Sequence, residues 1–172
     1  MTNDIILVDE FDREIGTAEK MAVHRTGRLH RAFSILIVNS RGEMLLQKRA
    51  RGKYHSGGLW TNACCSHPRT GRSLRAEASR RLLEEMGIRC EIEEIFSFRY
   101  RAEFANGLVE NEYDHVFLGK SDAEPRPNPA EAEAWRRIGD EELRAEIARE
   151  PERFTPWFRL IMEKLKVLSD EY

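Results

Sequence analysis

The sequence predicts an α+β fold, or an α/β/α sandwich with a mixed sheet, and two observations predict it. Paired strand-like segments with turn sequences between them occur at 32–48 and 90–118. Helical patterns with one apolar face occur at 74–86 and 157–168. Hairpins mixed with helices that must each bury one face are typical of helices packed on a sheet. The chain of 172 residues has the size of one domain, so we expect a single domain over 1–172.

The N-terminal elements are short and follow from local patterns. The apolar run at 5–8 predicts a first strand, and Thr17 is a suitable N-cap for a helix over 18–25. Residues 32–38 (AFSILIV) are rich in branched side chains and predict a buried strand. The turn sequence NSRG follows, and 43–48 predicts the returning strand. We therefore expect a hairpin here.

One helix has clear signals at both ends. Ser73 is a good N-cap and Gly87 a good C-terminal stop. Between them Leu74, Ala78 and Leu82 repeat four residues apart and form an apolar stripe. A charged stripe runs parallel to it, as expected for a solvated face with ion pairs one turn apart. The pattern by itself is that of an ordinary amphipathic helix.

The C-terminal half alternates strands and helices. Residues 90–104 predict a long or bent strand and 109–118 its partner, with a hairpin turn at 106–107. The remaining predicted elements are a strand over 133–138, a helix over 140–149 with Asp140 as its cap, and a helix beginning at Pro156 with the core-facing stripe Phe158, Ile161, Met162, Leu165 and Leu168.

Composition excludes several classes of function. The chain has 28 Lys and Arg against 30 Asp and Glu, so its charge gives no argument for nucleic acid or an anionic membrane. No apolar run approaches the roughly 20 residues of a membrane helix, and the N-terminus lacks a signal-peptide pattern. Three cysteines, two of them adjacent, do not make a disulfide framework. We expect a cytoplasmic protein with reduced thiols, a monomer or weak dimer that binds neither nucleic acid nor membrane.

Two short segments each hold a pair of reactive side chains two residues apart. Side chains alternate along a strand, so Cys65 and His67 share one side if their segment is extended. Glu110 and Glu112 share a side for the same reason. The alternative is a buried thiol, a surface histidine and a solvated acidic strand. Either motif alone leaves both interpretations open.

A loop rich in cations and glycine precedes the Cys/His segment. Residues 49–58 contain three cations and three glycines. Arg and Lys can clasp phosphate while glycine permits close backbone approach, so this is a candidate anion-binding loop. A mobile, solvated loop is the alternative. We assign no role to His55 or His115, which we expect to be structural or exposed, and we expect Cys90 to be a small core residue.

The segment 80–88 (RRLLEEMGI) resembles the second half of the Nudix box, REUxEExGU, in which U is aliphatic. Arg81 stands where a Nudix hydrolase has a glutamate, and Arg72 falls on another glutamate of the box. Hydrolases use such carboxylates to hold cations on a diphosphate, so arginine removes a metal ligand and supplies a phosphate clamp. Together with TNACCSHP, FRYRA, VENE and RLHRAFS, this altered box resembles the type I isopentenyl-diphosphate isomerase family over about residues 4–168.

The resemblance implies a Nudix-type α/β/α sandwich and the interconversion of isopentenyl and dimethylallyl diphosphate, the five-carbon units of isoprenoid biosynthesis. The catalytic residues that it implies are Cys65, Glu112 and Tyr100. The implied ligands of one divalent metal (Mn²⁺, Mg²⁺ or Zn²⁺) are His24, His30, His67, Glu110 and Glu112. Glu85 is implied to help a Mg²⁺ bind the substrate diphosphate. The implied substrate contacts are Lys20, Arg49, Lys53 and Arg81 on the diphosphate and Trp157 on the hydrocarbon tail.

This reaction adds a proton at one carbon of an unactivated alkene and removes one at another, through an intermediate that resembles a tertiary carbocation. Its site needs proton carriers on both sides of the alkene and must exclude water. Two other hypotheses stay open. A Nudix diphosphohydrolase predicts phosphate release and tolerance of Cys65→Ala, and Arg81 counts against it. A non-catalytic metal-binding or protein-binding module predicts no turnover and leaves Cys65 without a role.

Overall fold

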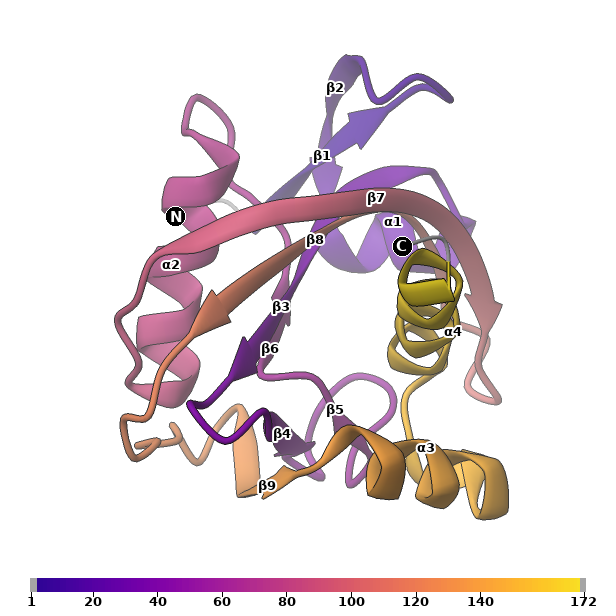
Figure 1. The fold of residues 1–172 in the computed structure, drawn as a ribbon. Helices are drawn as coiled ribbons and strands as arrows, with labels where there is room; N and C mark the ends of the chain where they lie inside the picture. The colour runs from indigo at the N-terminus through magenta and orange to yellow at the C-terminus, as the bar shows by residue number, and fades with distance from the viewer. Residues whose placement is uncertain (1–2, 171–172) are drawn as a thin grey trace.

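A curled mixed sheet with helices on both faces forms the centre of the computed structural model, which describes residues 3–170 (Figure 1). Its strands are β1 (Asp4–Val8), β2 (Glu14–Glu19), β3 (His30–Val38), β4 (Met44–Arg49), β5 (Trp60–Thr61), β6 (Cys64–Ser66), β7 (Ile92–Glu103), β8 (Val109–Lys120) and β9 (Ala132–Ile138). The helices are α1 (Lys20–Thr26), α2 (Leu74–Met86), α3 (Asp140–Arg149), α4 (Pro156–Asp170) and the short 3₁₀-helix η1 (Pro151–Arg153). The predicted sandwich with a mixed sheet is confirmed.

Strand β3 lies in the middle of the sheet and gives it its mixed character. It pairs in parallel with β8 along its whole length and antiparallel with β1 and β6. The turn after β3 forms as predicted, but β3 and β4 pair only at Val38 and Met44. Since β8, β1 and β6 occupy both edges of β3, β4 turns away and pairs with β5 and β9. The predicted hairpin is therefore confirmed at its turn, but its strand pairing stops after one residue pair.

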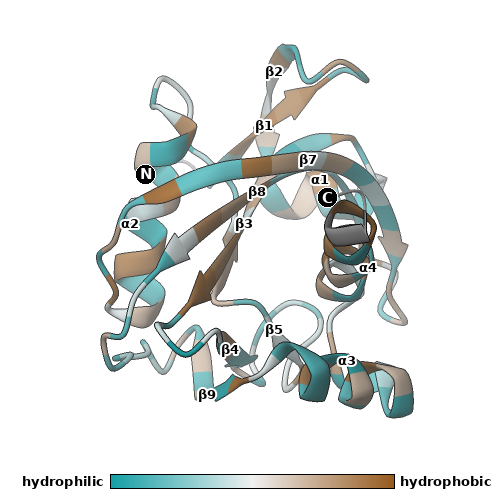
Figure 2. Ribbon diagram, viewed as in Figure 1, coloured by the Kyte–Doolittle hydropathy of each residue, from teal (hydrophilic) through white to brown (hydrophobic). Residues whose placement is uncertain are grey.

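Two buried apolar clusters lie on the two faces of the sheet. The cluster under α2 contains Phe33 of β3 and Leu82 of α2. The cluster under α3 and α4 contains Leu36 of β3 and Phe158 of α4. Figure 2 shows hydrophobic colour on β3 at the centre of the molecule and mixed colour along the helices. Burial on both faces explains the uninterrupted apolar pattern of 32–38.

Helix α2 begins and ends as predicted. The Ser73 hydroxyl accepts a hydrogen bond from the Ala76 amide, and Gly87 ends the helix in the left-handed conformation with φ 68°. A Cβ atom at Gly87 would lie 2.8 Å from the Cβ of Arg126, so the position favours glycine for its backbone and for its neighbour. Both ends of α2 are therefore determined by local sequence signals.

Helix α1 begins later than predicted. Thr17 is not its cap but lies in β2, where it pairs with Ile6 of β1. Glu19 is the N-cap, and its carboxylate accepts hydrogen bonds from the amides of Met21 and Ala22. Pairing with β1 keeps the chain extended through Glu19, so the helix cannot start earlier.

The C-terminal helices differ from prediction in two details. Gly139, not Asp140, is the N-cap of α3, and Asp140 is the first helical residue, where its charge is favoured by the helix dipole. Leu168 is 37% exposed, because the core cluster under α4 reaches only as far as Leu165. None of the helices within the described residues is long and apolar enough to cross a membrane.

The β7–β8 hairpin is confirmed and places three carboxyl groups on one face. A register shift between Glu94 and Phe96 bends β7, as the long-strand prediction allowed. Along β8, Glu110, Glu112 and Asp114 alternate with the other side chains, and all three are buried. Their face of β8 is the one that meets α4.

Candidate active site

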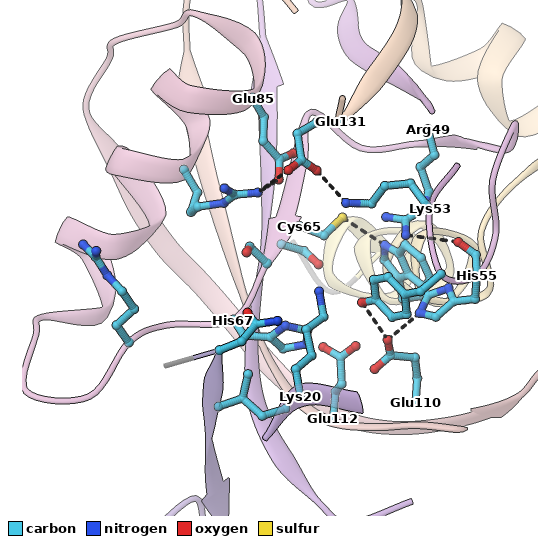
Figure 3. A pocket seen from close by; sticks show the side chains of 18 of the residues that line it. Lys20, Arg49, Lys53, His55, Cys65, His67, Glu85, Glu110, Glu112 and Glu131 are labelled. Atoms are coloured by element: carbon cyan, nitrogen blue, oxygen red, sulfur yellow. Dashed lines mark hydrogen bonds and ion pairs between the residues drawn. The ribbon is translucent and has the colours of Figure 1, made fainter. Parts of the chain in front are cut away.

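A pocket of about 730 Å³ opens between the sheet, the loop after β4 and α4 (Figure 3). Most residues singled out in the sequence line it, namely Lys20, Arg49, Lys53, Cys65, His67, Arg81, Glu85, Tyr100, Glu110, Glu112 and Trp157. Two further predicted residues, His24 and His30, have no exposed surface and make contacts with Glu110 in the pocket wall. The fold thus brings residues from across the chain to one cavity.

Three histidines and one glutamate form a cluster that fits a divalent metal. The nearest ligand atoms of His24, His30, His67 and Glu110 all lie within 4.8 Å of one another. In the described residues His30 Nε2, His67 Nε2 and Glu110 Oε2 are buried without a hydrogen-bond partner, although the first and last are 3.3 Å apart. Converging nitrogen and oxygen donors without partners suit a borderline divalent cation. Glu112 lies outside this group of four.

The protonation states of this cluster also suit a metal. Burial and the neighbouring His30 hold the pKa of His67 well below its usual range. Burial acts to raise the pKa of Glu110, but the neighbouring imidazoles of His24, His30 and His55 outweigh it and hold that pKa well below the usual range. A neutral imidazole and an ionised carboxylate are the forms that bind metal ions.

The Cys65 thiol is a half-buried proton donor that lines the pocket. It lies on β6 opposite Ser34 of β3. Its Sγ donates to Asn62 Oδ1 at 3.1 Å and accepts from Trp157 Nε1 at 3.0 Å. Burial raises the pKa of Cys65 to about 12, so the thiol keeps its proton at neutral pH. The neighbouring Cys64 belongs instead to the apolar cluster under α2.

Glu112 is a buried carboxyl group held by a tyrosine. The Tyr100 hydroxyl donates to Glu112 Oε1 at 2.6 Å, because β7 and β8 place the two residues directly opposite each other. Burial, followed by the negative charge of Glu110, raises the pKa of Glu112 well above its usual range. The pocket therefore holds two groups, Cys65 and Glu112, that can exchange a proton.

A third buried carboxyl, Asp114, was not singled out in the sequence. Its Oδ2 accepts from the Ser34 hydroxyl at 2.8 Å, and its Oδ1 is buried without a hydrogen-bond partner in the described residues. Burial raises the pKa of Asp114 to about 7. The period-two pattern of Glu110 and Glu112 continues to Asp114, so the sequence contained the signal that could have found it.

Two of the four predicted cationic residues, Lys53 and Arg81, form ion pairs in the pocket wall. Lys53 Nζ lies 2.5 Å from Glu131 Oε2, and Arg81 Nη2 lies 2.6 Å from Glu85 Oε1. Arg81 also reaches Glu131 at 3.2 Å, so Glu131 bridges the two cations. Nothing in the sequence around Glu131 indicated this contact, which depends on the long connection between β8 and β9.

The other two cations are held over aromatic rings. The Lys20 ammonium lies 4.1 Å from the centre of the Tyr54 ring. Burial and the nearby Lys53 lower the pKa of Lys20 to about 8. The Arg49 guanidinium lies 5.2 Å from the centre of the Trp157 ring. Four positive side chains thus face a pocket that also holds the thiol and carboxyl groups.

His55, to which the sequence assigned no role, lies inside the pocket. It is 6% exposed, and its Nε2 lies 2.5 Å from Glu110 Oε1. It is in a loop, where residue spacing does not show which way a side chain points. His115 is structural, as expected, and contacts Asp12 and Glu94. Cys90 is half-buried and packs against the cluster under α2.

Comparison with known proteins places this site in a family. A sequence profile of the NUDIX domain matches residues 28–158. The chain is 49% identical over 171 residues to isopentenyl-diphosphate Delta-isomerase 1 of Aromatoleum aromaticum, covering 99% of this chain and 97% of that protein. This chain belongs to the isopentenyl-diphosphate Delta-isomerase family of NUDIX proteins. A second relative agrees, since the chain is 49% identical over 165 residues to the isopentenyl-diphosphate Delta-isomerase of Serratia proteamaculans, covering 96% of this chain and 92% of that protein.

Solved structures support the fold of this isomerase-family chain. A crystal structure of a protein from Deinococcus radiodurans matches it with a TM-score of 0.78 at 19% identity, over 94% of this chain and 98% of that one. A MutT protein from Methanosarcina mazei matches with a TM-score of 0.68 at 20% identity, over 82% and 95%. At these identities the likeness shows the NUDIX fold alone.

Helix α2 shows how this member of the isopentenyl-diphosphate Delta-isomerase family departs from the hydrolase pattern of the Nudix box. Arg81 stands at the position of a hydrolase glutamate, and its guanidinium pairs with Glu84, Glu85 and Glu131. Burial acts to lower the pKa of Arg81, but these neighbouring carboxylates raise it above its usual range. A permanent positive charge therefore faces the pocket from the middle of the box.

Proposed function

We propose that this chain interconverts isopentenyl diphosphate and dimethylallyl diphosphate by adding a proton at one carbon and removing one at another. One observation carries the proposal: two proton carriers, the half-buried Cys65 and the buried Glu112, line the same pocket as four cationic side chains. The pocket thus combines proton transfer with anion binding. The names of the chain's relatives support the same activity.

Cys65 and Glu112 are the proposed proton carriers. One donates its proton to the terminal carbon of the alkene, which leaves a cation-like centre at the adjacent tertiary carbon. The other, in its deprotonated form, accepts a proton from the next carbon, and that C–H electron pair becomes the new double bond. Each group leaves the reaction in the opposite protonation state, so each serves as donor in one direction and as acceptor in the other. Tyr100, hydrogen-bonded to Glu112, would orient that carboxyl and relay its proton.

The cationic side chains would hold the diphosphate. Lys20, Arg49, Lys53 and Arg81 are the proposed contacts. Arg81 and Lys53 share Glu131 as a partner in the free protein, so an incoming diphosphate would compete with that carboxylate for both cations. Glu85 is proposed to meet a Mg²⁺ that accompanies the diphosphate. Charge-assisted hydrogen bonds from guanidinium groups suit this anion, since they are stronger than neutral hydrogen bonds.

The cluster of His24, His30, His67 and Glu110 is proposed to bind one divalent cation, which is Mn²⁺, Mg²⁺ or Zn²⁺, with Glu112 as a further ligand. When bound, the cation would withdraw electron density from the adjacent carboxyl group and make it a stronger acid. His24 and His30 have no exposed surface. Exclusion of water from the alkene would protect a cation-like intermediate from being trapped as an alcohol.

Trp157 would complete the hydrocarbon end of the pocket. It is 4% exposed and its Nε1 is hydrogen-bonded to Cys65 Sγ, so the ring is held beside the thiol. The face of an aromatic ring attracts a cation by roughly 0.5 to 2 kcal/mol, or more when desolvated. The same side chain would therefore stabilise the intermediate and fix the orientation of the proposed proton carrier.

The test is proton NMR of the purified protein with isopentenyl diphosphate, Mg²⁺ and Mn²⁺ in D₂O. We expect conversion to the dimethylallyl isomer with uptake of deuterium, and loss of both in Cys65→Ala. Cys64→Ala is the matched control, because Cys64 is the adjacent buried thiol on the other face of the sheet. Unchanged substrate with the wild-type protein, together with phosphate release from a nucleoside diphosphate, would instead establish a diphosphohydrolase.

A further inference from the structure

His55 connects the proposed metal cluster with the aromatic wall of the pocket. Its side chain is 2% exposed, although it comes from the loop between β4 and β5. Its ring stacks on Phe104, with centroids 4.2 Å apart and planes 5° apart. It also meets the edge of Trp157 at 5.7 Å. A buried, oriented histidine at this place is a candidate for a role in the reaction.

The loop that carries His55 has a constrained backbone. Ser56 has φ 54° and Gly58 has φ 78°, so two of the three residues that follow His55 have a left-handed backbone conformation. A Cβ atom at Gly57 would lie 2.6 Å from the carbonyl oxygen of Arg51, so only glycine fits there. A left-handed serine costs free energy and persists where the surroundings require it. The loop conformation that directs His55 inward is therefore maintained at a cost.

Hydrogen bonds fix both the position and the tautomer of His55. Arg49 Nη2 donates to the His55 carbonyl oxygen at 3.2 Å. The Ser56 hydroxyl lies 3.1 Å from His55 Nδ1 and can donate to it. Nε2 then carries the ring proton and donates to Glu110 Oε1 at 2.5 Å.

His55 provides the shorter of two hydrogen bonds that can orient Glu110 when His24 binds a metal. Oε1 lies near two imidazole nitrogens, His55 Nε2 at 2.5 Å and His24 Nε2 at 2.9 Å, and accepts a longer hydrogen bond from the Tyr54 hydroxyl at 3.4 Å. A ligating imidazole nitrogen carries no proton, so His24 cannot bind a metal through Nε2 and also donate to Glu110. His55 can continue to donate, which keeps Oε2 directed at His30 Nε2, 3.3 Å away.

We propose that His55 is a positioning residue that orients Glu110 for the divalent metal through its Nε2–H hydrogen bond. The inference rests on the metal cluster of the proposed function. Groups that hold a metal ligand from behind typically change metal affinity by 10- to 100-fold when they are removed.

Two substitutions separate the hydrogen bond from the ring. His55→Phe keeps an aromatic ring to stack on Phe104 and removes the donor. His55→Gln keeps an N–H donor of similar reach and removes the ring. Calorimetric titration of the metal-free full chain with Mn²⁺ should show binding about 10- to 100-fold weaker in His55→Phe. His55→Gln should stay within about threefold of the wild type, because it retains the donor.

Controls distinguish this role from loss of structure. His115→Gln changes a histidine that also contacts two carboxylates but lies outside the pocket lining, and it should leave Mn²⁺ affinity unchanged. Circular dichroism and the melting temperature report folding of each variant. His55→Leu is a second variant without a donor, to be used if His55→Phe does not fold.

Three results would overturn the inference: wild-type affinity in His55→Phe, equal weakening in His55→Phe and His55→Gln, or no Mn²⁺ binding by the wild-type protein. The proposed function is tested separately by turnover of isopentenyl diphosphate. Donor-dependent Mn²⁺ binding without isomerisation would reject that function and leave the role of His55 supported.

Discussion

Two groups of buried carboxylates, one on α2 and one on β8, differ in how their charge is balanced. Glu77 of α2 is 1% exposed. Its oxygens accept hydrogen bonds from the guanidinium groups of Arg69 and Arg80 at 2.9 to 3.3 Å. Burial acts to raise the pKa of Glu77, but these hydrogen bonds outweigh it and lower the pKa to about 2. This carboxylate is therefore ionised at neutral pH.

The β8 group lacks such compensation. Among the described residues, Glu110, Glu112 and Asp114 have no ion pair with lysine or arginine, and their hydrogen-bond partners include histidine, tyrosine and serine. The pKa values of Glu112 and Asp114 are raised, chiefly by burial. Arginine partners fix a carboxylate in one charge state, whereas neutral partners leave it able to exchange a proton or bind a cation. The first arrangement stabilises the fold, and the second provides reactivity at a cost in stability.

Glu112→Gln should show the largest difference between the β8 carboxylates and the α2 carboxylates, because it should affect activity and not stability. The amide cannot exchange a proton with the alkene, so we expect kcat to fall about 10³-fold, which is about 4 kcal/mol. The melting temperature should not fall, because the substitution removes a buried acid beside Glu110. Turnover of isopentenyl diphosphate and thermal unfolding measure the two effects. Retained turnover would show that the proton carrier is elsewhere.

A divalent cation should stabilise the β8 side of the molecule. At a concentration of about 100 times its Kd, Mn²⁺ should raise the unfolding free energy by about 2.7 kcal/mol. His67→Ala should abolish this effect, since it removes one of the four converging ligands. Thermal unfolding of metal-free protein with and without Mn²⁺ is the measurement. An equal increase in His67→Ala would place the cation at another site.

Glu77→Gln should lower the free energy of unfolding and leave turnover of isopentenyl diphosphate unchanged. The pKa shift of Glu77 from 4.5 to about 2 corresponds to about 2 kcal/mol at neutral pH, after a discount because Arg69 and Arg80 are partly exposed.

The contribution of Glu77 to the free energy of unfolding depends on pH, and its sign follows from the direction of the pKa shift. The folded-state pKa of Glu77 lies below the unfolded value, so its contribution is fully present above pH 4.5 and is lost as the pH falls toward 2. Urea unfolding of wild type and Glu77→Gln at several pH values measures it. A difference that stays constant down to acid pH would mean that packing, not charge, carries the effect.

The smallest expected change is Ser73→Ala. It removes the hydroxyl that caps α2, the helix that carries both Glu77 and Arg81. We expect a loss of about 1 kcal/mol in unfolding free energy with kcat unchanged. A change in kcat or KM would show that the start of α2 is coupled to the pocket through Arg81.

Much of the fold could be predicted because its signals are local. The caps of α2 and the β7–β8 hairpin depend on residues within a few positions of each other. The expectation for Thr17 was wrong because β1, a separate strand, keeps it extended. The expected β3–β4 pairing is limited to one residue pair, because β8, β1 and β6 occupy the edges of β3. Propensity describes one segment, whereas pairing depends on which other segments are present.

The sequence by itself determined the period-two pairs, Cys65 with His67 and Glu110 with Glu112, because alternation along a strand is a local property. Only the tertiary structure decided that they meet. The parallel register of β3 and β8 places His30 opposite Glu112, and α1 brings His24 to Glu110 from 86 residues away. His55 shows the limit most clearly, since a loop side chain has no periodicity. Its inward direction follows from backbone conformation and contacts that exist only in the folded chain.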